Sequence, residues 1–424
     1  MATKTKADDA PEDSKAPSAP AAPPSPRTGR AAIEVKALRA AMKDMGAVVE
    51  KRNTVPVLAC VLIAVGPSTM TLTATDLDLQ LVRQLDLAEA GSGVAFTLAV
   101  DAGVLRDICN KLPGDEMMLL EHAPAAGGTG GQLRISCGPT RYVLHALPPD
   151  DFPILRPEGD AGDARFEMPR GTLQQLLEAV AFAQSTEPTR YYLNGIFLHG
   201  EESPEGEADL LVAAATDGHR LAVMRVEAPE GALGLNGLGG KPGVILGSKA
   251  VRILCALLDN EGGVPTIDCS FSARTLVAEI GTTTLTAKLI DGTFPVYTRV
   301  IPTVHNVNAW VDPKGLATIV ERVTTLATDK TRSVRLDLER ASVIRASVTS
   351  PEAGTAQDEI EAQLDGPGAA PGLTVGFNST YLCQVLAHLT ASPALLRFSD
   401  SAGAVLIMDA EDSRRQFVLM PMRV

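Results

Sequence analysis

The sequence predicts an α+β fold in which one chain forms three similar domains. Three observations support this prediction: the length of 424 residues, six segments with apolar residues at helical spacing, and short β-rich runs between those segments. A chain of this length is too long for one ordinary core and suits about three domains. Because a helix and several strands alternate along the whole chain, we expect two helices and antiparallel sheets in each domain.

The six predicted helices each place aliphatic residues or methionine on one face, as an amphipathic helix requires. In chain order, the apolar sets are Val35, Leu38, Met42, Met45 and Val49; Val104, Leu105, Ile108 and Leu112; Leu173, Leu176, Leu177 and Val180; Val251, Leu254 and Leu258; Leu316, Ile319, Val320, Val323 and Leu326; and Leu382, Val385, Leu386 and Leu389. Several segments begin at a residue type that favours helix starts, namely Asp101, Pro169, Ser248, Asp312 and Asn378.

Strands are predicted between the helices wherever β-branched residues cluster or polar and apolar residues alternate. Examples are residues 70–75, 210–215, 282–289 and 334–338. Two internal echoes indicate that the unit repeats. Residues 73–81 are similar to 214–223, and residues 144–155 are similar to 287–300, with a Phe-Pro pair in each. Repeats of this length are typical of stacked or cyclic copies of one supersecondary unit.

Composition limits the class of protein further. Hydrophobic residues make up 45% of the chain and aromatic residues only 4%, so aliphatic side chains must fill the cores. The formal net charge of -13 disfavours a strongly basic surface, although an acidic exterior with a mildly basic lining gives the same sum. The six cysteines form no CxxC pair, which predicts buried, reduced thiols in a cytoplasmic protein without a metal site. No apolar run approaches the ~20 residues of a membrane helix, so no membrane partner is expected.

Residues 1–30 differ in composition from the rest of the chain. They hold six prolines together with many alanine, serine and charged residues. Such a segment cannot bury a core and is expected to be a disordered tail. It lacks the apolar stretch of a signal peptide.

The most distinctive motifs are four short runs in a fixed order. They are RYYLNG at residues 190–195, ATDGHRLAV at 215–223, KLIDGTFPVYTRVIP at 288–302 and FVLMPMRV at 417–424. Together they resemble the bacterial DNA sliding clamp family, the beta subunit of DNA polymerase III, and the similarity extends over roughly residues 32–424. The resemblance implies the DNA clamp fold, with helices inside a ring and sheets outside. It also implies clamp domains at 31–158, 165–303 and 306–424, and a homodimer that closes a ring of six domains.

The resemblance further implies a function without catalysis, cofactor or metal. A sliding clamp encircles duplex DNA without sequence preference and tethers the replicative polymerase, which raises processivity. The implied partners are the DNA polymerase III catalytic subunit, a separate clamp loader, and other polymerases and repair proteins that carry a clamp-binding peptide.

By the same resemblance, a peptide-binding pocket forms between the second and third domains. The matching positions are Leu193, Thr216, Gly218, His219, Arg220, Leu221, Pro295, Arg299, Val300, Ala402, Ala404, Val418, Leu419, Met420, Pro421, Met422, Arg423 and Val424. Ala402 and Ala404 stand where the family usually carries a larger or polar residue, which leaves the ligand preference open.

Two further groups of residues match functional positions of the family. The positions that match DNA contacts are Arg52, Arg190, Tyr191, Tyr192 and Lys249. The positions that match the dimer contact are Tyr142 and Leu144 on a strand of the first domain and Leu326 beside a helix of the third.

Two alternatives from other classes stay open at this point. Asp217 and His219 could serve a hydrolase or transferase, although no Gly-x-Ser-x-Gly elbow and no third partner at a recognisable spacing accompany them. The repeats could also build an adaptor that never meets DNA. The glycine-rich run at residues 231–247 is not a P-loop, because Pro242 follows Lys241 where a serine or threonine is needed. We expect this run to be a disordered surface loop.

Overall fold

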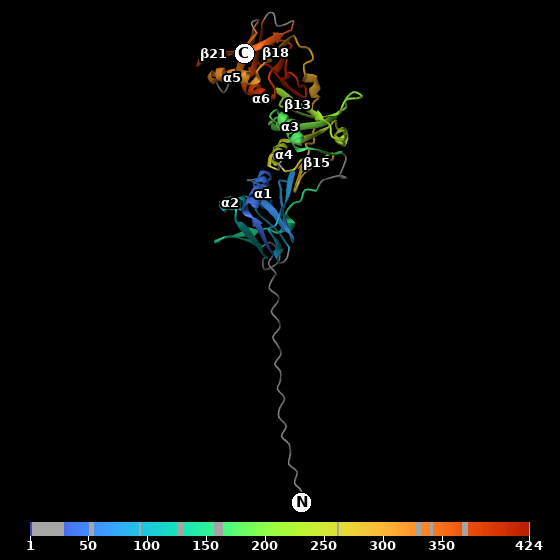
Figure 1. Ribbon diagram of the computed structural model, residues 1–424, viewed down its shortest axis with the longest axis vertical. Coiled ribbons are helices and arrows are strands. Elements are labelled where there is room, and N and C mark those ends of the chain that lie inside the picture. The colour runs from blue at the N-terminus through green and yellow to red at the C-terminus, as the bar shows by residue number, and fades with distance from the viewer. Residues whose placement is uncertain are drawn as a thin grey trace.

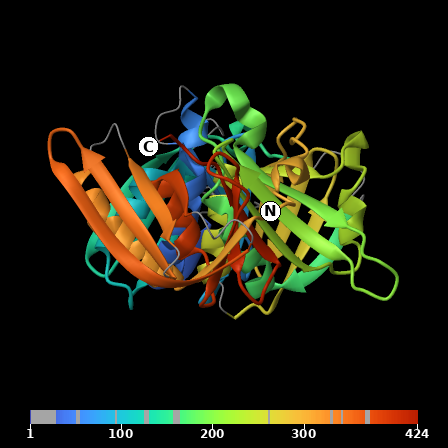
Figure 2. The same cartoon turned by 90° about the horizontal axis from the view of Figure 1, so that it is seen from above.

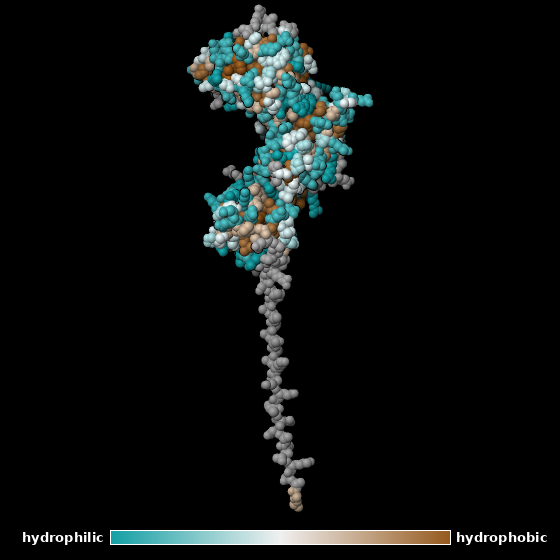
Figure 3. All heavy atoms as spheres, in the orientation of Figure 1, coloured by the Kyte–Doolittle hydropathy of each residue, from teal (hydrophilic) through white to brown (hydrophobic). Residues whose placement is uncertain are grey.

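The computed structural model describes residues 1, 29–50, 55–92, 95–124, 131–156, 164–260, 263–327, 332–339, 342–366 and 372–423. In this part of the chain, three units of helices and antiparallel strands follow one another along the long axis (Figure 1). The units form an arc, and the helices lie toward its concave side, so the predicted α+β fold of three similar domains is confirmed. The face in Figure 3, including the hollow of the arc, is mostly hydrophilic.

The first domain contains two helices and strands of two sheets. They are β1 (Arg30–Glu34), α1 (Val35–Val48), β2 (Cys60–Val65), β3 (Thr69–Thr75), β4 (Leu79–Asp86), β5 (Glu89–Ser92), β6 (Phe96–Asp101), α2 (Ala102–Lys111), β7 (Met117–Pro124), β8 (Gly131–Cys137) and β9 (Thr140–Ala146).

The second domain repeats this order of a helix followed by strands. It contains β10 (Ala164–Pro169), α3 (Arg170–Ala181), β11 (Gly195–Glu201), β12 (Leu210–Thr216), β13 (Arg220–Glu227), β14 (Val244–Gly247), α4 (Ser248–Asn260), β15 (Thr266–Phe271), β16 (Thr275–Ile280) and β17 (Thr283–Lys288).

The third domain repeats it once more. It contains β18 (Val307–Val311), α5 (Pro313–Val323), β19 (Ser333–Glu339), β20 (Val343–Ser350), β21 (Gly354–Asp365), β22 (Leu373–Asn378), α6 (Ser379–Ala387), β23 (Ala394–Phe398), β24 (Val405–Asp409) and β25 (Arg415–Leu419).

Two sheets run across the domain boundaries and join the domains through backbone hydrogen bonds. In the first, β4 pairs with β17, which links the first and second domains. In the second, β13 pairs with β25, which links the second and third domains. Seen from above, the red C-terminal strands accordingly lie between the green strands of the second domain and the orange sheet of the third (Figure 2).

The helices form where the apolar spacing predicts them, and they pack in pairs, α1 with α2, α3 with α4 and α5 with α6. Asp101, Asp312 and Asn378 act as the predicted N-caps, since each side chain accepts a hydrogen bond from a backbone N–H of the first turn. Val104 was expected on the buried face of α2 but is 46% exposed.

The structure corrects two predictions about irregular segments. Arg30, placed in the tail, begins β1 because its backbone pairs with β5 and β7. The glycine-rich run is ordered rather than disordered: it forms two short 3₁₀-helices and β14, and Ala232, Leu235 and Leu238 are buried. Residues 2–28, most of the predicted tail, lie outside the described residues.

All six cysteines have free thiols. Four of them are buried, and burial raises the pKa of Cys269 to about 12, so this thiol stays protonated. None of the helices in the described ranges is long and apolar enough to cross a membrane.

Candidate functional site at the junction of the second and third domains

A tight turn between β12 and β13 forms one wall of the candidate site. The Thr216 hydroxyl donates to the carbonyl of Arg220 at 2.6 Å and accepts from the Gly218 N–H at 3.1 Å. Oδ1 of Asp217 accepts from the N–H groups of His219 and Arg220 at 2.9 and 3.0 Å. Gly218 has φ of 90°, a conformation that favours glycine. The sequence thus encodes a turn in which the aspartate carboxylate serves the backbone.

The geometry gives Asp217 and His219 no catalytic arrangement. The second carboxylate oxygen of Asp217 is bonded to Nε of Arg220 at 3.1 Å. The His219 ring stacks on Tyr381 at 6.2 Å, with an interplanar angle of 26°. No hydroxyl or thiol nucleophile is bonded to this imidazole in the described contacts, and those residues contain no cluster suited to a metal ion.

Below the turn, apolar residues from distant segments converge. Leu193, Leu221 and Val418 are 4%, 2% and 2% exposed and belong to one cluster, which Ala404 contacts from its edge. Leu419, the next residue of β25, is fully buried and faces the larger core instead. This alternation follows from the period of two in a strand, so one end of β25 serves both the core and the site.

The residues expected to form the rim of the site are mostly exposed, and most of them are apolar. Val300, Met420 and Met422 are 52%, 46% and 40% exposed. Pro295, Arg299, Ala402 and Arg423 are also exposed, Thr216 and Pro421 are half-buried, and Val424 lies outside the described residues. The chain end runs beside the turn at Met420, whose N–H donates to the carbonyl of His219 at 3.0 Å. It then contacts β22 of the third domain, where the Met422 N–H donates to the carbonyl of Gly376 at 2.9 Å.

The segment that connects the second and third domains is anchored by residues that the sequence analysis missed. Phe294 stacks on Phe197 at 4.9 Å, and the Tyr297 hydroxyl lies 2.9 Å from Nε2 of His199. Burial lowers the pKa of His199 and raises that of Tyr297 to about 12, which favours a neutral pair. These contacts hold Pro295 and the neighbouring residues of the rim. The Phe-Pro pair that recurs in residues 144–155 and 287–300 was the sequence signal that could have identified Phe294 as an anchor.

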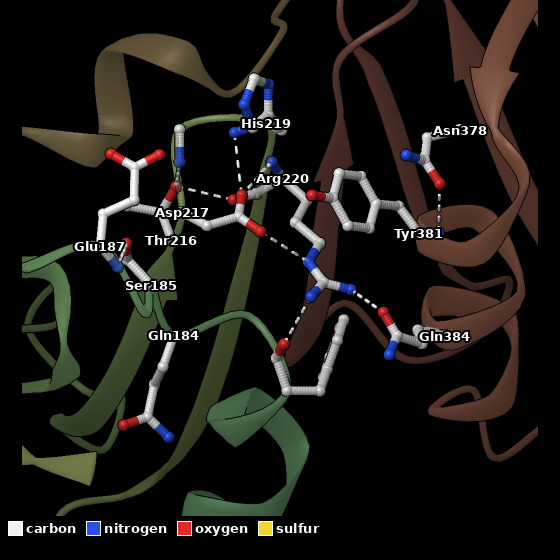
Figure 4. A network of polar contacts seen from close by, with 12 residues as sticks. Gln184, Ser185, Glu187, Thr216, Asp217, His219, Arg220, Asn378, Tyr381 and Gln384 are labelled. Atoms are coloured by element: carbon white, nitrogen blue, oxygen red, sulfur yellow. Dashed lines mark hydrogen bonds and ion pairs between the residues drawn. The ribbon is translucent and has the colours of Figure 1, made fainter. Parts of the chain in front are cut away.

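Arg220 differs most from its expected role as a donor on the pocket surface. It is only 8% exposed, and its guanidinium bonds to Asp217, to the carbonyl of Phe182 and to Gln384 of α6 (Figure 4). These bonds use donors at all three guanidinium nitrogens within the protein, and one of them crosses into the third domain.

The residues that match DNA contacts are not equally accessible. Tyr191 is 52% exposed, while Arg190 is ion-paired with Glu187 at 2.7 Å. Tyr192 is half-buried against the apolar cluster. Lys249 at the start of α4 donates to the carbonyl of Val48 at 2.8 Å and is paired with Asp76. Arg52 lies outside the described residues.

The residues that match the dimer contact lie at the two ends of the arc. Tyr142 and Leu144 belong to β9, which ends its sheet, and both pack partly against the core. Leu326 ends a 3₁₀ turn that follows α5 and is half-buried. Within one chain they do not meet.

Three similar domains joined edge to edge by sheets that cross both junctions define a clamp-type subunit. Family models for the N-terminal, central and C-terminal domains of the DNA polymerase III beta subunit match residues 31–156, 167–296 and 298–423. The chain therefore belongs to the DNA polymerase III beta subunit family.

Individual relatives agree with this assignment. The beta sliding clamp of Caulobacter vibrioides is 36% identical over 395 residues, which cover 93% of this chain and 100% of the relative. That of Escherichia coli K12 is 30% identical over 92% of this chain and 99% of its own length. A crystal structure of the C. crescentus clamp superposes with a TM-score of 0.83 at 35% identity, covering 94% of this chain and all of that one. In that crystal, polyethylene glycol occupies a region described as tethering the beta motif.

A second solved structure carries a ligand of another kind. The sliding clamp of Bartonella birtlesii, bound to griselimycin, superposes with a TM-score of 0.81 at 34% identity. It covers 94% of this chain and all of that one.

Proposed function

We propose that this chain is a DNA sliding clamp that encircles duplex DNA and tethers the DNA polymerase III catalytic subunit through the junction site. The single observation that carries the proposal is the match of all three domains, over nearly the whole chain, to one family of clamps. The chain would act in the cytoplasm without catalysis, and a separate loader would open the ring. Other polymerases and repair proteins would use the same site. We keep the domain boundaries 31–158, 165–303 and 306–424 as part of this proposal.

The pairing rule inside the chain supports a ring made of two chains. At each internal junction, the strand after the turn pairs with the last strand of the next domain: β4 with β17, and β13 with β25. The equivalent strand of the third domain is β21, and the last strand of the first domain is β9. In the described residues, β9 ends its sheet, and residues 354–361 of β21 pair only with β20. Joining these edges head to tail between two copies would leave no open edge.

Charge also supports this contact. Arg141 of β9 is exposed, whereas β21 carries Asp358, Glu359 and Glu361, of which Asp358 and Glu359 are also paired with Arg322 and Arg345 of their own domain. Opposite charges on facing strands favour the pairing and its direction. Tyr142, Leu144 and Leu326 would contribute the apolar part of the interface.

For DNA, we propose weak binding that is independent of sequence. Topological linkage needs few phosphate contacts, and the net charge of -13 leaves only a modest basic lining. The salt dependence of direct binding should therefore correspond to roughly fewer than five neutralised phosphates. Arg52→Ala and Lys249→Ala should weaken binding to all sequences alike, and Arg190, Tyr191 and Tyr192 are proposed to contact DNA near the mouth of the channel. A strong preference for one sequence would contradict the proposal.

For partners, we propose that the site binds a short extended peptide with a glutamine and an end of the type Leu-x-Leu/Phe. The apolar floor below His219 and the two exposed methionines suit such side chains, since each buried leucine or phenylalanine contributes about 1.5–3 kcal/mol. Deleting Met422 and the two residues after it should reduce affinity about tenfold or more while leaving the dimer intact. Calorimetry with a synthetic peptide tests this, and equal affinity of the truncated and full chains would show that the site is placed wrongly.

A further inference from the structure

Arg220 lies at the start of β13 and directs its guanidinium across the junction between the second and third domains. Nε donates to Asp217 at 3.1 Å and Nη2 to the carbonyl of Phe182 at 2.7 Å, both in the second domain. Nη1 donates to Oε1 of Gln384 in α6 of the third domain (Figure 4). At 8% exposure, these charge-assisted bonds are largely shielded from water and are stronger than surface bonds.

Two aromatic rings enclose the same guanidinium. Its central carbon lies 5.0 Å from the ring centre of Phe182 and 4.4 Å from that of Tyr381. Such cation–π contacts gain strength when they are desolvated. Tyr381 also stacks on the exposed ring of His219 at 6.2 Å, and both side chains lie beside Arg220 in Figure 4. A chain of direct contacts therefore leads from the rim of the site to the buried guanidinium and on to α6.

We infer that Arg220 is a positioning residue of the peptide site, and that it couples occupancy of the site to the junction between the second and third domains. Through Asp217 it holds the turn that presents Gly218 and His219, and through Gln384 it holds α6. The inference rests on the proposed peptide site. Because coupling between two sites is reciprocal, a ligand that orders the turn must also order the junction.

A second arginine on the same strand provides the matched control. Nη1 of Arg225 donates to Oε1 of Gln416 at 3.0 Å, which also joins β13 to β25 across the junction. Its Nε donates to Glu201 at 3.1 Å. This tie lies at the other end of the paired strands, away from the turn. If Arg220 had a purely structural role, removing either glutamine acceptor would change the peptide affinity equally. If Arg220 positions the site, only the removal of Gln384 should lower that affinity.

The experiment compares full-length wild type, Gln384→Ala and Gln416→Ala by calorimetry with the synthetic peptide Gln-Leu-Ser-Leu-Phe. We expect Gln384→Ala to weaken binding about five- to twentyfold and Gln416→Ala by less than about twofold. Gln384→Glu, which keeps an acceptor for Arg220, should restore most of the affinity. In hydrogen exchange, the peptide should slow the amides of α6 in the wild type and Gln416→Ala but not in Gln384→Ala.

Three outcomes overturn the inference. Equal binding by Gln384→Ala and the wild type would show that Arg220 does not position the site. Equal weakening by Gln384→Ala and Gln416→Ala would show only a general loss of junction stability. A wild type that does not bind the peptide at all would overturn the peptide site itself, and the inference with it, so failure of the proposed function is distinguishable from failure of the coupling alone.

Discussion

The two junctions within the chain use the same kind of turn but different polar contacts between the domains. At the first junction, the Thr75 hydroxyl donates to the carbonyl of Leu79 at 2.7 Å, as Thr216 does to Arg220 at the second. In both turns, Oδ1 of the following aspartate accepts two backbone N–H groups. The other oxygen of Asp76 is paired with Lys249 of the next domain. Asp217 instead binds Arg220 of its own domain, which then reaches the next one.

The cations that make the two interdomain contacts differ in burial. The Lys249 side chain is 34% exposed, whereas that of Arg220 is 8% exposed and lies between two aromatic rings. The second junction also contains the separate apolar cluster that includes Leu193, Leu221 and Val418. The two contacts therefore differ in the burial of the cation and not of the carboxylate, since Asp76 is 6% exposed and Asp217 is 14% exposed. In the described part of the chain, the second junction places an apolar floor and exposed methionines beside its turn, which supports the proposed ligand site there.

The largest effect is expected at the third junction, which the pairing rule places between two chains. Leu326→Asp would bury an unpaired carboxylate, costing several kcal/mol at each of two interfaces. We expect the variant to sediment as a monomer at micromolar concentration, while the wild type sediments as a dimer. A wild-type monomer, or a dimer undisturbed by the substitution, would mean that the third junction does not follow the two within the chain.

The next largest effect is expected from removing the buried guanidinium of Arg220. Arg220→Ala leaves the Asp217 carboxylate, which is 14% exposed, without its cation. Removing one partner of such a buried pair costs about 3–5 kcal/mol. Urea unfolding should show this loss in the transition that involves the second and third domains. A loss below 1 kcal/mol would indicate that water replaces the guanidinium without penalty.

The equivalent change at the first junction should cost less. Lys249→Ala removes an ammonium that is one-third exposed, so water can take its place beside Asp76, whose carboxylate is itself 6% exposed and keeps two backbone donors, as Asp217 does. We expect a loss of about 1–2 kcal/mol by the same urea measurement. If the two alanine variants were equally destabilised, burial would not be what distinguishes the junctions.

The sequence predicted the repeated architecture well because helix and strand periodicities are local properties. The Asp101, Asp312 and Asn378 caps and the six helices follow from spacing and residue type alone. The buried state of Arg220 could not be predicted, because its acceptor Gln384 comes from another domain and arginine is rarely buried. The ordered glycine-rich run was a misjudgement of composition: Ala232, Leu235 and Leu238 recur at a spacing of three, which was an available sign of burial.

A smaller effect on stability is expected at the residue that follows the aspartate in each turn. Leu77 has φ of 78° and is 47% exposed, whereas Gly218 has φ of 90° at the equivalent position. A non-glycine residue in this region costs about 1–2 kcal/mol, and glycine returns about 0.5–1 kcal/mol of that as entropy. Leu77→Gly should therefore change the free energy of unfolding by less than about 1 kcal/mol, in the stabilising direction. Gly218→Ala should destabilise, because alanine rarely adopts a φ of 90°, and Nη1 of Arg190, 2.7 Å from the added Cβ, would also have to move. A destabilising Leu77→Gly, or a Gly218→Ala that does not destabilise, in thermal unfolding would refute the equivalence of the turns.

The smallest effect is a pH dependence at the second junction. Because the carbonyl of Gly200 can only accept, Nδ1 of neutral His199 carries the proton, and Nε2 accepts from the Tyr297 hydroxyl. Burial holds the pKa of His199 below its ordinary 6.5 in the folded chain. As the pH falls below 6.5, the unfolded chain therefore binds more protons at this histidine than the folded chain does. The contribution of neutral His199 to the free energy of unfolding is complete above pH 6.5 and is lost as the pH falls through the folded-state pKa. His199→Gln should flatten the plot of unfolding free energy against pH between about pH 7.5 and pH 5. Parallel plots for the variant and the wild type would show that the decline comes from other groups, of which His122 and His305 also have pKa values lowered by burial.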